Sequence, residues 1–155
     1  MRIRIVAIGR LRAGPEASLI DDYLTRYERT GRSLGLGTIQ IDQLEARKGG
    51  QAEEAALLLK SLERSDFVVA LDERGKTMTS PQFADRIVDV RDAGLRDMAF
   101  VVGGADGLTP DVRDRADLIM SFGKMVWPHM LARVMLTEQL YRAASILAGA
   151  PYHRA

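Results

Sequence analysis

The sequence contains no cysteine, only two histidines and a single tryptophan in its 155 residues. The absence of cysteine excludes disulfides, thiolate metal ligands and a cysteine nucleophile. His129 and His153 are far apart and form no His-x-x-x-His pair, so we expect no zinc site. No apolar run approaches the roughly 20 residues that span a bilayer, and the apolar stretch at 3–8 is too short for a signal peptide. We therefore expect a cytoplasmic protein with no metal and no membrane span.

The composition is typical of one globular domain covering residues 1–155. Hydrophobic residues make up 46% and charged residues 28% of the chain, which excludes a disordered or fibrous protein. The net charge is only +1, but residues 1–14 carry four arginines and no acid, and residues 124–155 sum to +3. If these two ends meet in space, they form a basic surface suited to phosphate groups. The alternative is that these arginines are solvated edge residues.

Strand-length apolar runs alternate with helical patterns along the whole chain. The runs are at 3–8, 38–41, 67–71, 98–102 and 118–120, and the helices are expected from 15 to about 30, at 51–64, at 80–91, from 110, and at 128–147. Proline follows a turn or capping residue at three of these helix starts, where its missing N–H is harmless. This alternation predicts an α/β fold, a mostly parallel sheet with helices on both faces.

Three loops follow buried strands and are therefore expected at the same edge of the sheet, where ligands of such folds bind. Residues 72–76 hold four charges, which indicate a solvated loop or, alternatively, cations for a phosphate. Residues 103–107 read Gly-Gly-x-x-Gly, which is neither the dinucleotide fingerprint nor a P-loop. These glycines either make a tight turn or let a flat ligand approach the backbone. The third loop is 121–127.

The last 30 residues concentrate the groups most suited to chemistry. His129 enters the final helix, and Tyr152, His153 and Arg154 lie in the tail after it. Such a tail is either frayed or folded into a site. The helix itself is expected to place six residues in the core: Leu131, Val134, Met135, Leu140, Ala144 and Leu147. Its apolar stripe is wide enough to include Met130, Leu136 and Tyr141 as well, which predicts a subunit interface.

No Ser-His-Asp spacing, paired-carboxylate motif or metal cluster stands out, so the chemistry must need few protein groups. Methyl transfer from S-adenosylmethionine fits, because its sulfonium is already activated and the protein mainly aligns the methyl group with its acceptor. One rival is a non-catalytic RNA-binding or ribosome-associated module. A second rival, a phosphohydrolase using residues 103–107, lacks metal-binding carboxylates.

Five ordered segments resemble the ribosomal RNA large subunit methyltransferase H family of the SPOUT class. They are LDERGK at 71–76, VGGADG at 102–107, PHMLAR at 128–133, EQLYRA at 138–143 and PYHR at 151–154. The resemblance runs from end to end of the chain. It implies a C-terminal trefoil knot, a homodimer, bound S-adenosylmethionine, and N3-methylation of a pseudouridine in 23S rRNA of the assembled 70S ribosome.

The resemblance also implies site residues. The cofactor contacts carry over to Leu71, Gly103, Phe122, Gly123, Lys124, Met125, Val126 and Trp127. The family commonly reads Leu-Ser-x-x-Thr-Leu at 122–127, so hydroxyls expected at 123 and 126 are missing here. We therefore expect backbone groups to hold the cofactor at this segment.

For the RNA we expect catalytic roles for five residues near the end of the chain. Tyr152 stacks on a base, Arg142 and Arg154 hold flanking phosphates, and His153 accepts a proton or positions the nucleotide. His129, nearer the cofactor loop, is the second candidate for the base.

Overall fold

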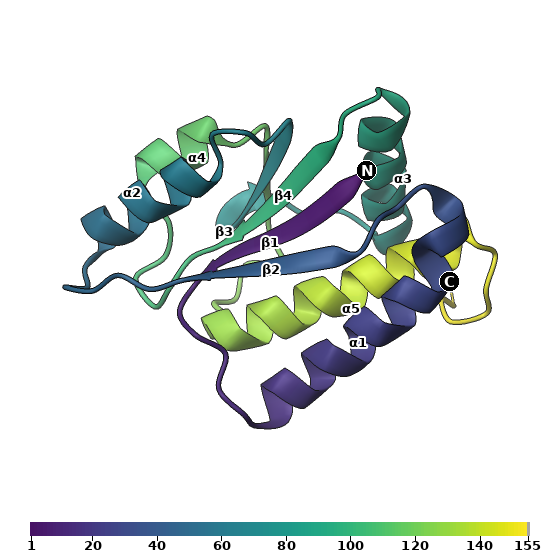
Figure 1. The fold of residues 1–155 in the computed structure, drawn as a ribbon, viewed down its shortest axis with the longest axis horizontal. Helices are drawn as coiled ribbons and strands as arrows, with labels where there is room; N and C mark the ends of the chain where they lie inside the picture. The colour runs from purple at the N-terminus through teal and green to yellow at the C-terminus, as the bar shows by residue number, and fades with distance from the viewer. Residues whose placement is uncertain (155) are drawn as a thin grey trace.

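A computed structural model describes residues 1–154 as a five-stranded sheet with helices on both faces (Figure 1). The strands are β1 (Arg2–Ile8), β2 (Ile39–Leu44), β3 (Phe67–Lys76), β4 (Asp97–Val102) and β5 (Leu118–Met120). Their order is β2-β1-β4-β3-β5, and each neighbouring pair is parallel. The predicted parallel sheet is confirmed, and its carboxyl ends meet at one edge.

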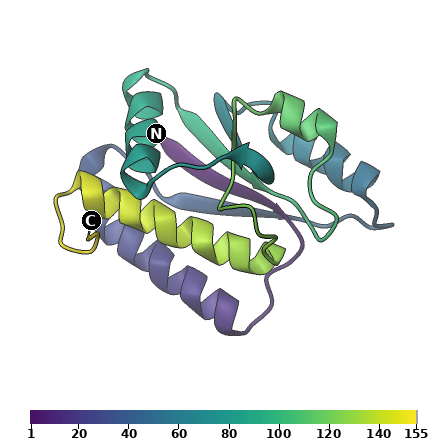
Figure 2. The ribbon, with the colours of Figure 1, turned by 180° about the vertical axis from the view of Figure 1, so that it is seen from behind.

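The helices divide into two layers. They are α1 (Pro15–Gly31), α2 (Gln51–Ser61), α3 (Ser80–Asp92), α4 (Pro110–Arg115) and α5 (His129–Leu147), with a short 3-10 helix η1 (Arg32–Leu34) after α1. As Figure 2 shows from behind, α1, α3 and α5 cover one face, and α2 and α4 cover the other. None of the helices in this described part of the chain is long and apolar enough to cross a membrane. The trefoil knot stays a prediction.

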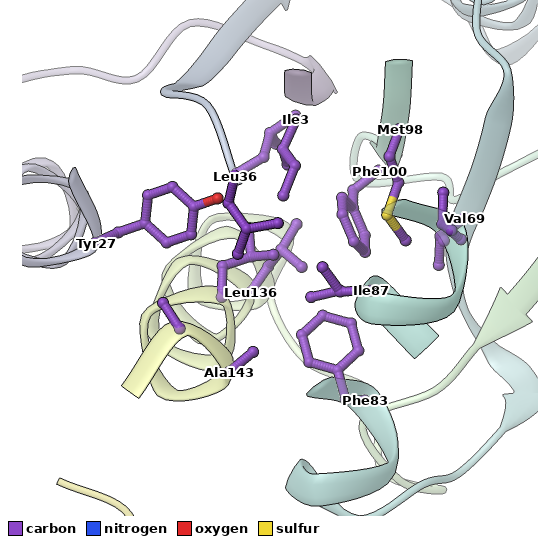
Figure 3. Close-up of a cluster of buried hydrophobic side chains, with 14 of the residues drawn as sticks. Ile3, Tyr27, Leu36, Val69, Phe83, Ile87, Met98, Phe100, Leu136 and Ala143 are labelled. Atoms are coloured by element: carbon purple, nitrogen blue, oxygen red, sulfur yellow. The ribbon is translucent and has the colours of Figure 1, made fainter. Parts of the chain in front are cut away.

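The larger core lies between the sheet and α1, α3 and α5 (Figure 3). Phe83 and Phe100 meet edge to face at 5.8 Å, and Leu136 is fully buried beside them. Leu136 is therefore core, not the interface residue that the sequence suggested. Leu131 is 40% exposed instead of buried, because at about 100° per residue it lies on the opposite side of α5 from buried Arg133.

The charged segment after residue 71 is part of β3 rather than a free loop. Leu71 and Lys76 both pair with Met120, so residues 72–75 bulge out of the strand. A Cβ at Gly75 would lie 2.6 Å from the carbonyl carbon and oxygen of Ile119. Only glycine lets β3 return this close to β5, so the bulge and the start of the 121–127 segment are fixed together.

The arginines of β1 do not form the expected basic surface. Arg4 is buried and bonds to Asp42 at 2.8 Å and to Asp97 at 3.2 Å. Arg2 also bonds to Asp97, at 2.6 Å. Their charges are neutralised by carboxylates of neighbouring strands, which the sequence pattern could not reveal.

Candidate functional site

A cavity of about 600 Å³ lies where β3, β4 and β5 end. Its walls come from the three loops singled out in the sequence, together with Gln51 of α2 and the first turn of α5. Of the residues expected to bind a cofactor, seven line this cavity: Leu71, Gly103, Phe122, Gly123, Met125, Val126 and Trp127. Lys124 is exposed and lies outside the lining. The convergence of the three loops is confirmed.

The 121–127 segment is shaped by its own backbone. The Ser121 hydroxyl donates to the carbonyl of Gly123 at 2.7 Å and accepts from its N–H at 3.0 Å. Gly123 has φ of 120°, a region that favours glycine. Glycine at 123 is therefore required by this turn, and the hydroxyl that matters locally is that of Ser121, which the sequence analysis missed.

The glycine loop, residues 103–107, lines the cavity and is closed by a backbone hydrogen bond of its own. The N–H of Gly107 donates to the carbonyl of Gly104 at 3.0 Å. A Cβ at Gly103 would lie 3.0 Å from the carbonyl carbon of Gly107 and from Leu108. The tight turn by itself therefore requires glycine at 103, which is one of the two interpretations that the sequence left open.

The charged bulge is organised around Asp72. Its side chain is only 6% exposed and lies 3.4 Å from Arg74 and 3.8 Å from Arg113. It also accepts the backbone N–H of Arg74 at 2.9 Å. Arg74 is therefore engaged with Asp72, which leaves it less suited to a phosphate than the sequence suggested.

The charges that line the cavity are mainly negative. The acidic lining residues are Asp72, Glu73 and Asp106, against Arg74 and the imidazole of His129. Within residues 1–154, no group of three acidic or histidine side chains is arranged to hold a metal ion. The cavity thus suits a ligand that carries positive charge.

The mouth of the cavity exposes large apolar side chains. Met125 is 75% exposed, Val126 79% and Trp127 43%, and all three line the cavity. Leu131, in the first turn of α5, is also exposed. Isolated exposed hydrophobic side chains are ordinary, but three consecutive ones that line a cavity are typical of a surface that another molecule covers.

A second cluster of side chains holds the C-terminal tail, residues 148–154, against α5. Tyr152 stacks on Tyr141 with ring centroids 4.5 Å apart and donates its hydroxyl to Glu138 at 2.9 Å. Arg142 bonds to the same carboxylate at 2.6 Å and lies 3.2 Å from Nδ1 of His153. The tail is therefore folded, not frayed.

These contacts also shift two ionisation equilibria. Burial raises the pKa of Tyr152, and its bond to Glu138 raises it further. The hydrogen bond to Glu138 raises the pKa of Arg142. Arg142 is half-buried and bonded to Glu138, whereas Arg154 is exposed.

The tail cluster and the cavity lie at opposite ends of α5. His129 begins the helix at the cavity, and Arg142 lies thirteen positions later, about 20 Å along the axis at 1.5 Å per residue. In Figure 1 the C-terminus lies near the C-terminal end of α5, away from the first turn of this helix. Of the five residues expected to act on RNA, only His129 lines the cavity of its own chain.

Sequence comparisons agree over the whole chain. A family model described as "Predicted SPOUT methyltransferase" matches residues 1–153. The ribosomal RNA large subunit methyltransferase H of Cereibacter sphaeroides is 61% identical over 155 residues, covering 99% of each chain. The protein of the same name from Ruegeria pomeroyi is also 61% identical, again with 99% of each chain covered.

Solved structures share the fold. A probable methylase family protein from Haemophilus influenzae has a TM-score of 0.57 at 15% identity, covering 99% of this chain and 70% of its own. A probable methyltransferase from Bordetella pertussis has a TM-score of 0.52 at 12% identity, covering 92% and 95%.

Proposed function

The chain belongs to the SPOUT methyltransferase family, and we propose that it transfers a methyl group from S-adenosylmethionine to large-subunit ribosomal RNA. The observation that carries this proposal is the cavity at the end of the sheet. It is built from the three loops to which the resemblance assigns the cofactor, in a chain that matches its named relatives end to end.

The residues present fit the cofactor. Leu71, Val102 and Met120 give the cavity an apolar wall, and its volume lies within the range of small-molecule sites. Glu73 and Asp106, which unlike Asp72 form no ion pair within residues 1–154, suit the positive sulfonium and ammonium groups. The backbone of Gly103 and of residues 122–127 would hold the cofactor, which supplies an activated methyl group when bound.

We propose N3 of a pseudouridine in 23S rRNA of the assembled 70S ribosome as the acceptor, in the cytoplasm. Exposed Arg154 would contact phosphate. The ring of Tyr152 stacks on Tyr141 and lies 4.8 Å from the guanidinium of Arg142, so it would have to leave these partners to stack on a base. Arg142, engaged by Glu138, holds the tail in place. His153 or His129 takes up the N3 proton, because imidazole exchanges protons near neutral pH.

We further propose that the active enzyme is a homodimer in which one protomer's tail completes the cavity of its partner. The tail of a single chain lies about 20 Å from its own cavity, as estimated from the helical rise. The second copy would cover four exposed apolar side chains, those of Met125, Val126, Trp127 and Leu131. Leu131→Glu should therefore give a monomer in light scattering and abolish methylation. A fully active monomer of 17.1 kDa would refute the shared site.

The deciding experiment is transfer of labelled methyl groups from S-adenosylmethionine to 70S ribosomes, isolated subunits and free 23S rRNA. We expect labelled large-subunit rRNA, with 70S particles as the preferred substrate. Cofactor binding is followed separately by the fluorescence of Trp127, the single tryptophan, which becomes less exposed when the cavity is filled. Binding of cofactor and ribosome without transfer would favour the non-catalytic module instead.

A further inference from the structure

The guanidinium of Arg142 is held in one orientation at the C-terminal end of α5. Its Nε and Nη2, which share one edge of the planar group, both donate to Oε1 of Glu138, at 3.0 and 2.6 Å. Its face lies over the ring of Tyr152, with Cζ 4.8 Å from the ring centroid. Because one edge and one face are occupied, the direction of the remaining nitrogen, Nη1, is also fixed.

This remaining nitrogen contacts the imidazole of the tail. Nη1 of Arg142 lies 3.2 Å from Nδ1 of His153. A guanidinium has five N–H donors and no acceptor, and it stays charged in proteins. The hydrogen bond to Glu138 raises the pKa of Arg142 further above its ordinary value. Arg142 is therefore the donor of this hydrogen bond, and Nδ1 of His153 is the acceptor.

The acceptor role of Nδ1 determines the tautomer of His153. In a neutral imidazole one ring nitrogen carries the proton and the other carries a lone pair. The hydrogen bond that one nitrogen makes sets the state of the other. Since Nδ1 accepts from Arg142, the proton of the neutral ring lies on Nε2. An imidazolium has an N–H on both nitrogens, so it would lose this bond and place a second cation beside the guanidinium.

The Nε2–H group of His153 is available to a ligand. Nε2 makes no hydrogen bond within residues 1–154, and the side chain is only partly buried. The next residue, Arg154, is exposed. An N–H donor beside an exposed arginine suits a ligand that presents both acceptor oxygens and phosphate, as RNA does.

We infer that His153 donates a hydrogen bond from Nε2 to a carbonyl oxygen of the acceptor base, and that Arg142 is the positioning residue that holds it in this tautomer. The inference rests on the proposed function, in which His153 and His129 were alternatives for the proton acceptor. In His153 one nitrogen is occupied by Arg142 and the other already carries a proton. His129 is therefore the imidazole that takes up the proton.

A donor at this place assists the transfer because N3 of a uracil ring lies between two carbonyl groups. The N3–H bond breaks, the N–C bond forms, and the electron pair of the S–CH₃ bond stays with sulfur. As the proton passes to His129, negative charge develops on the flanking carbonyl oxygens. A preorganised N–H donor stabilises this charge. In the proposed dimer the donor and the proton acceptor come from different protomers.

The first test reads the tautomer directly. The protein has only two histidines, so ¹⁵N NMR resolves each imidazole of the full-length protein without ligand, at a pH where both are neutral. We expect the proton of His153 on Nε2 and a hydrogen-bonded lone pair on Nδ1. Arg142→Met, which has no donor, should move the Nδ1 signal toward that of free imidazole. Tyr152→Phe is the matched control, because it removes a different partner of Glu138 and leaves Nη1 in place.

The second test separates a donor from a base by kinetics. The amide of glutamine has an N–H group near the position of Nε2 but takes up no proton at neutral pH. His153→Leu, which has no donor, should lower kcat about 100-fold, the loss typical of one donor to a developing oxyanion. His153→Gln should recover most of this loss, whereas His129→Gln should not recover the loss of His129→Leu. Equal losses in His153→Gln and His153→Leu would overturn the donor role.

The tautomer is measured on the unaltered protein, so the inference stays open to refutation if a variant fails to fold. A proton on Nδ1 of His153 in a protein that methylates ribosomes overturns the inference and leaves the proposed function intact. A protein with the expected tautomer that never methylates RNA overturns the proposed function instead.

Discussion

The guanidinium of Arg133 in α5 donates to the carbonyl oxygen of Ile8, 125 residues earlier, at 3.1 Å. The same Nη2 reaches the carbonyl of Gly9 at 3.2 Å. Arg133 is completely buried, its Nε and Nη1 have no partner within residues 1–154, and burial lowers its pKa. This arginine therefore fastens the end of β1 to the helix that begins at the cavity, and it does so without a carboxylate.

Replacing Arg133 with methionine should change the free energy of unfolding by less than about 1.5 kcal/mol. The loss of the bonds to Ile8 and Gly9 is offset by the removal of an unpaired buried charge at similar volume. Arg133→Ala, which leaves a cavity, should cost about 3 kcal/mol. Urea denaturation of both variants measures the difference. Equal losses in the two would show that the charge itself is stabilising.

Gly75→Ala should lower the free energy of unfolding by about 2 kcal/mol, because the new Cβ overlaps the backbone of Ile119. It should also weaken cofactor binding, since β5 leads directly into residues 121–127. Gly31→Ala is the matched control. Its Cβ would meet Tyr27 at an ordinary 3.7 Å, and alanine favours the helix by up to about 1 kcal/mol. Losses of the same size in both variants would contradict the close approach of β3 to β5.

Deleting residues 152–155 should abolish RNA methylation and leave cofactor binding unchanged. The deletion removes the stacking of Tyr152 on Tyr141, which contributes about 1 kcal/mol, so the fold should survive. Labelled methyl transfer, cofactor titration and thermal unfolding separate the three effects. Tyr152→Phe, which loses only the hydrogen bond to Glu138, should retain most of the activity. Full activity of the truncated protein would show that the tail has no part in the reaction.

Glu54→Gln should raise the melting temperature at neutral pH. Burial and Asp106 raise the pKa of Glu54 above its ordinary 4.5, so the folded state keeps a proton that the unfolded state has already lost. The folded state therefore loses stability as the pH rises from the ordinary pKa to the raised one. The melting curves of the variant and the unaltered protein should coincide near pH 4 and separate above it. Thermal scans of both proteins from pH 4 to 8 check this.

The sequence predicted the layered fold and the cavity because both follow from local patterns. Continuous apolar strands such as Met98 to Val102 must be buried on both faces, and parallel strands bring their carboxyl ends together. β2 extends to Leu44, beyond the predicted residue 41, because Asp42 is held in the strand by Arg4. Such a pairing depends on a distant residue and leaves no local pattern.

For the same reason, the sequence could not predict which of the candidate site residues lie close together in one chain. The pattern indicated that Tyr152 and His153 were functional, but their separation from the cavity is set by the length of α5 and the docking of the tail on Glu138. The carboxylate oxygen of Glu54 that is unpaired within residues 1–154 could not be predicted at all, because it arises from packing against Gly104, a neighbour only in the folded chain.

The rigid spacing of His129 and Arg142 along α5 has a genetic consequence for the proposed dimer. A protomer with a damaged cavity still presents a sound tail, and a protomer without its tail still presents a sound cavity. Two inactive alleles of these kinds, expressed together, should complement each other. Each mixed dimer then contains one intact composite site. Its other site has both a damaged cavity and no tail.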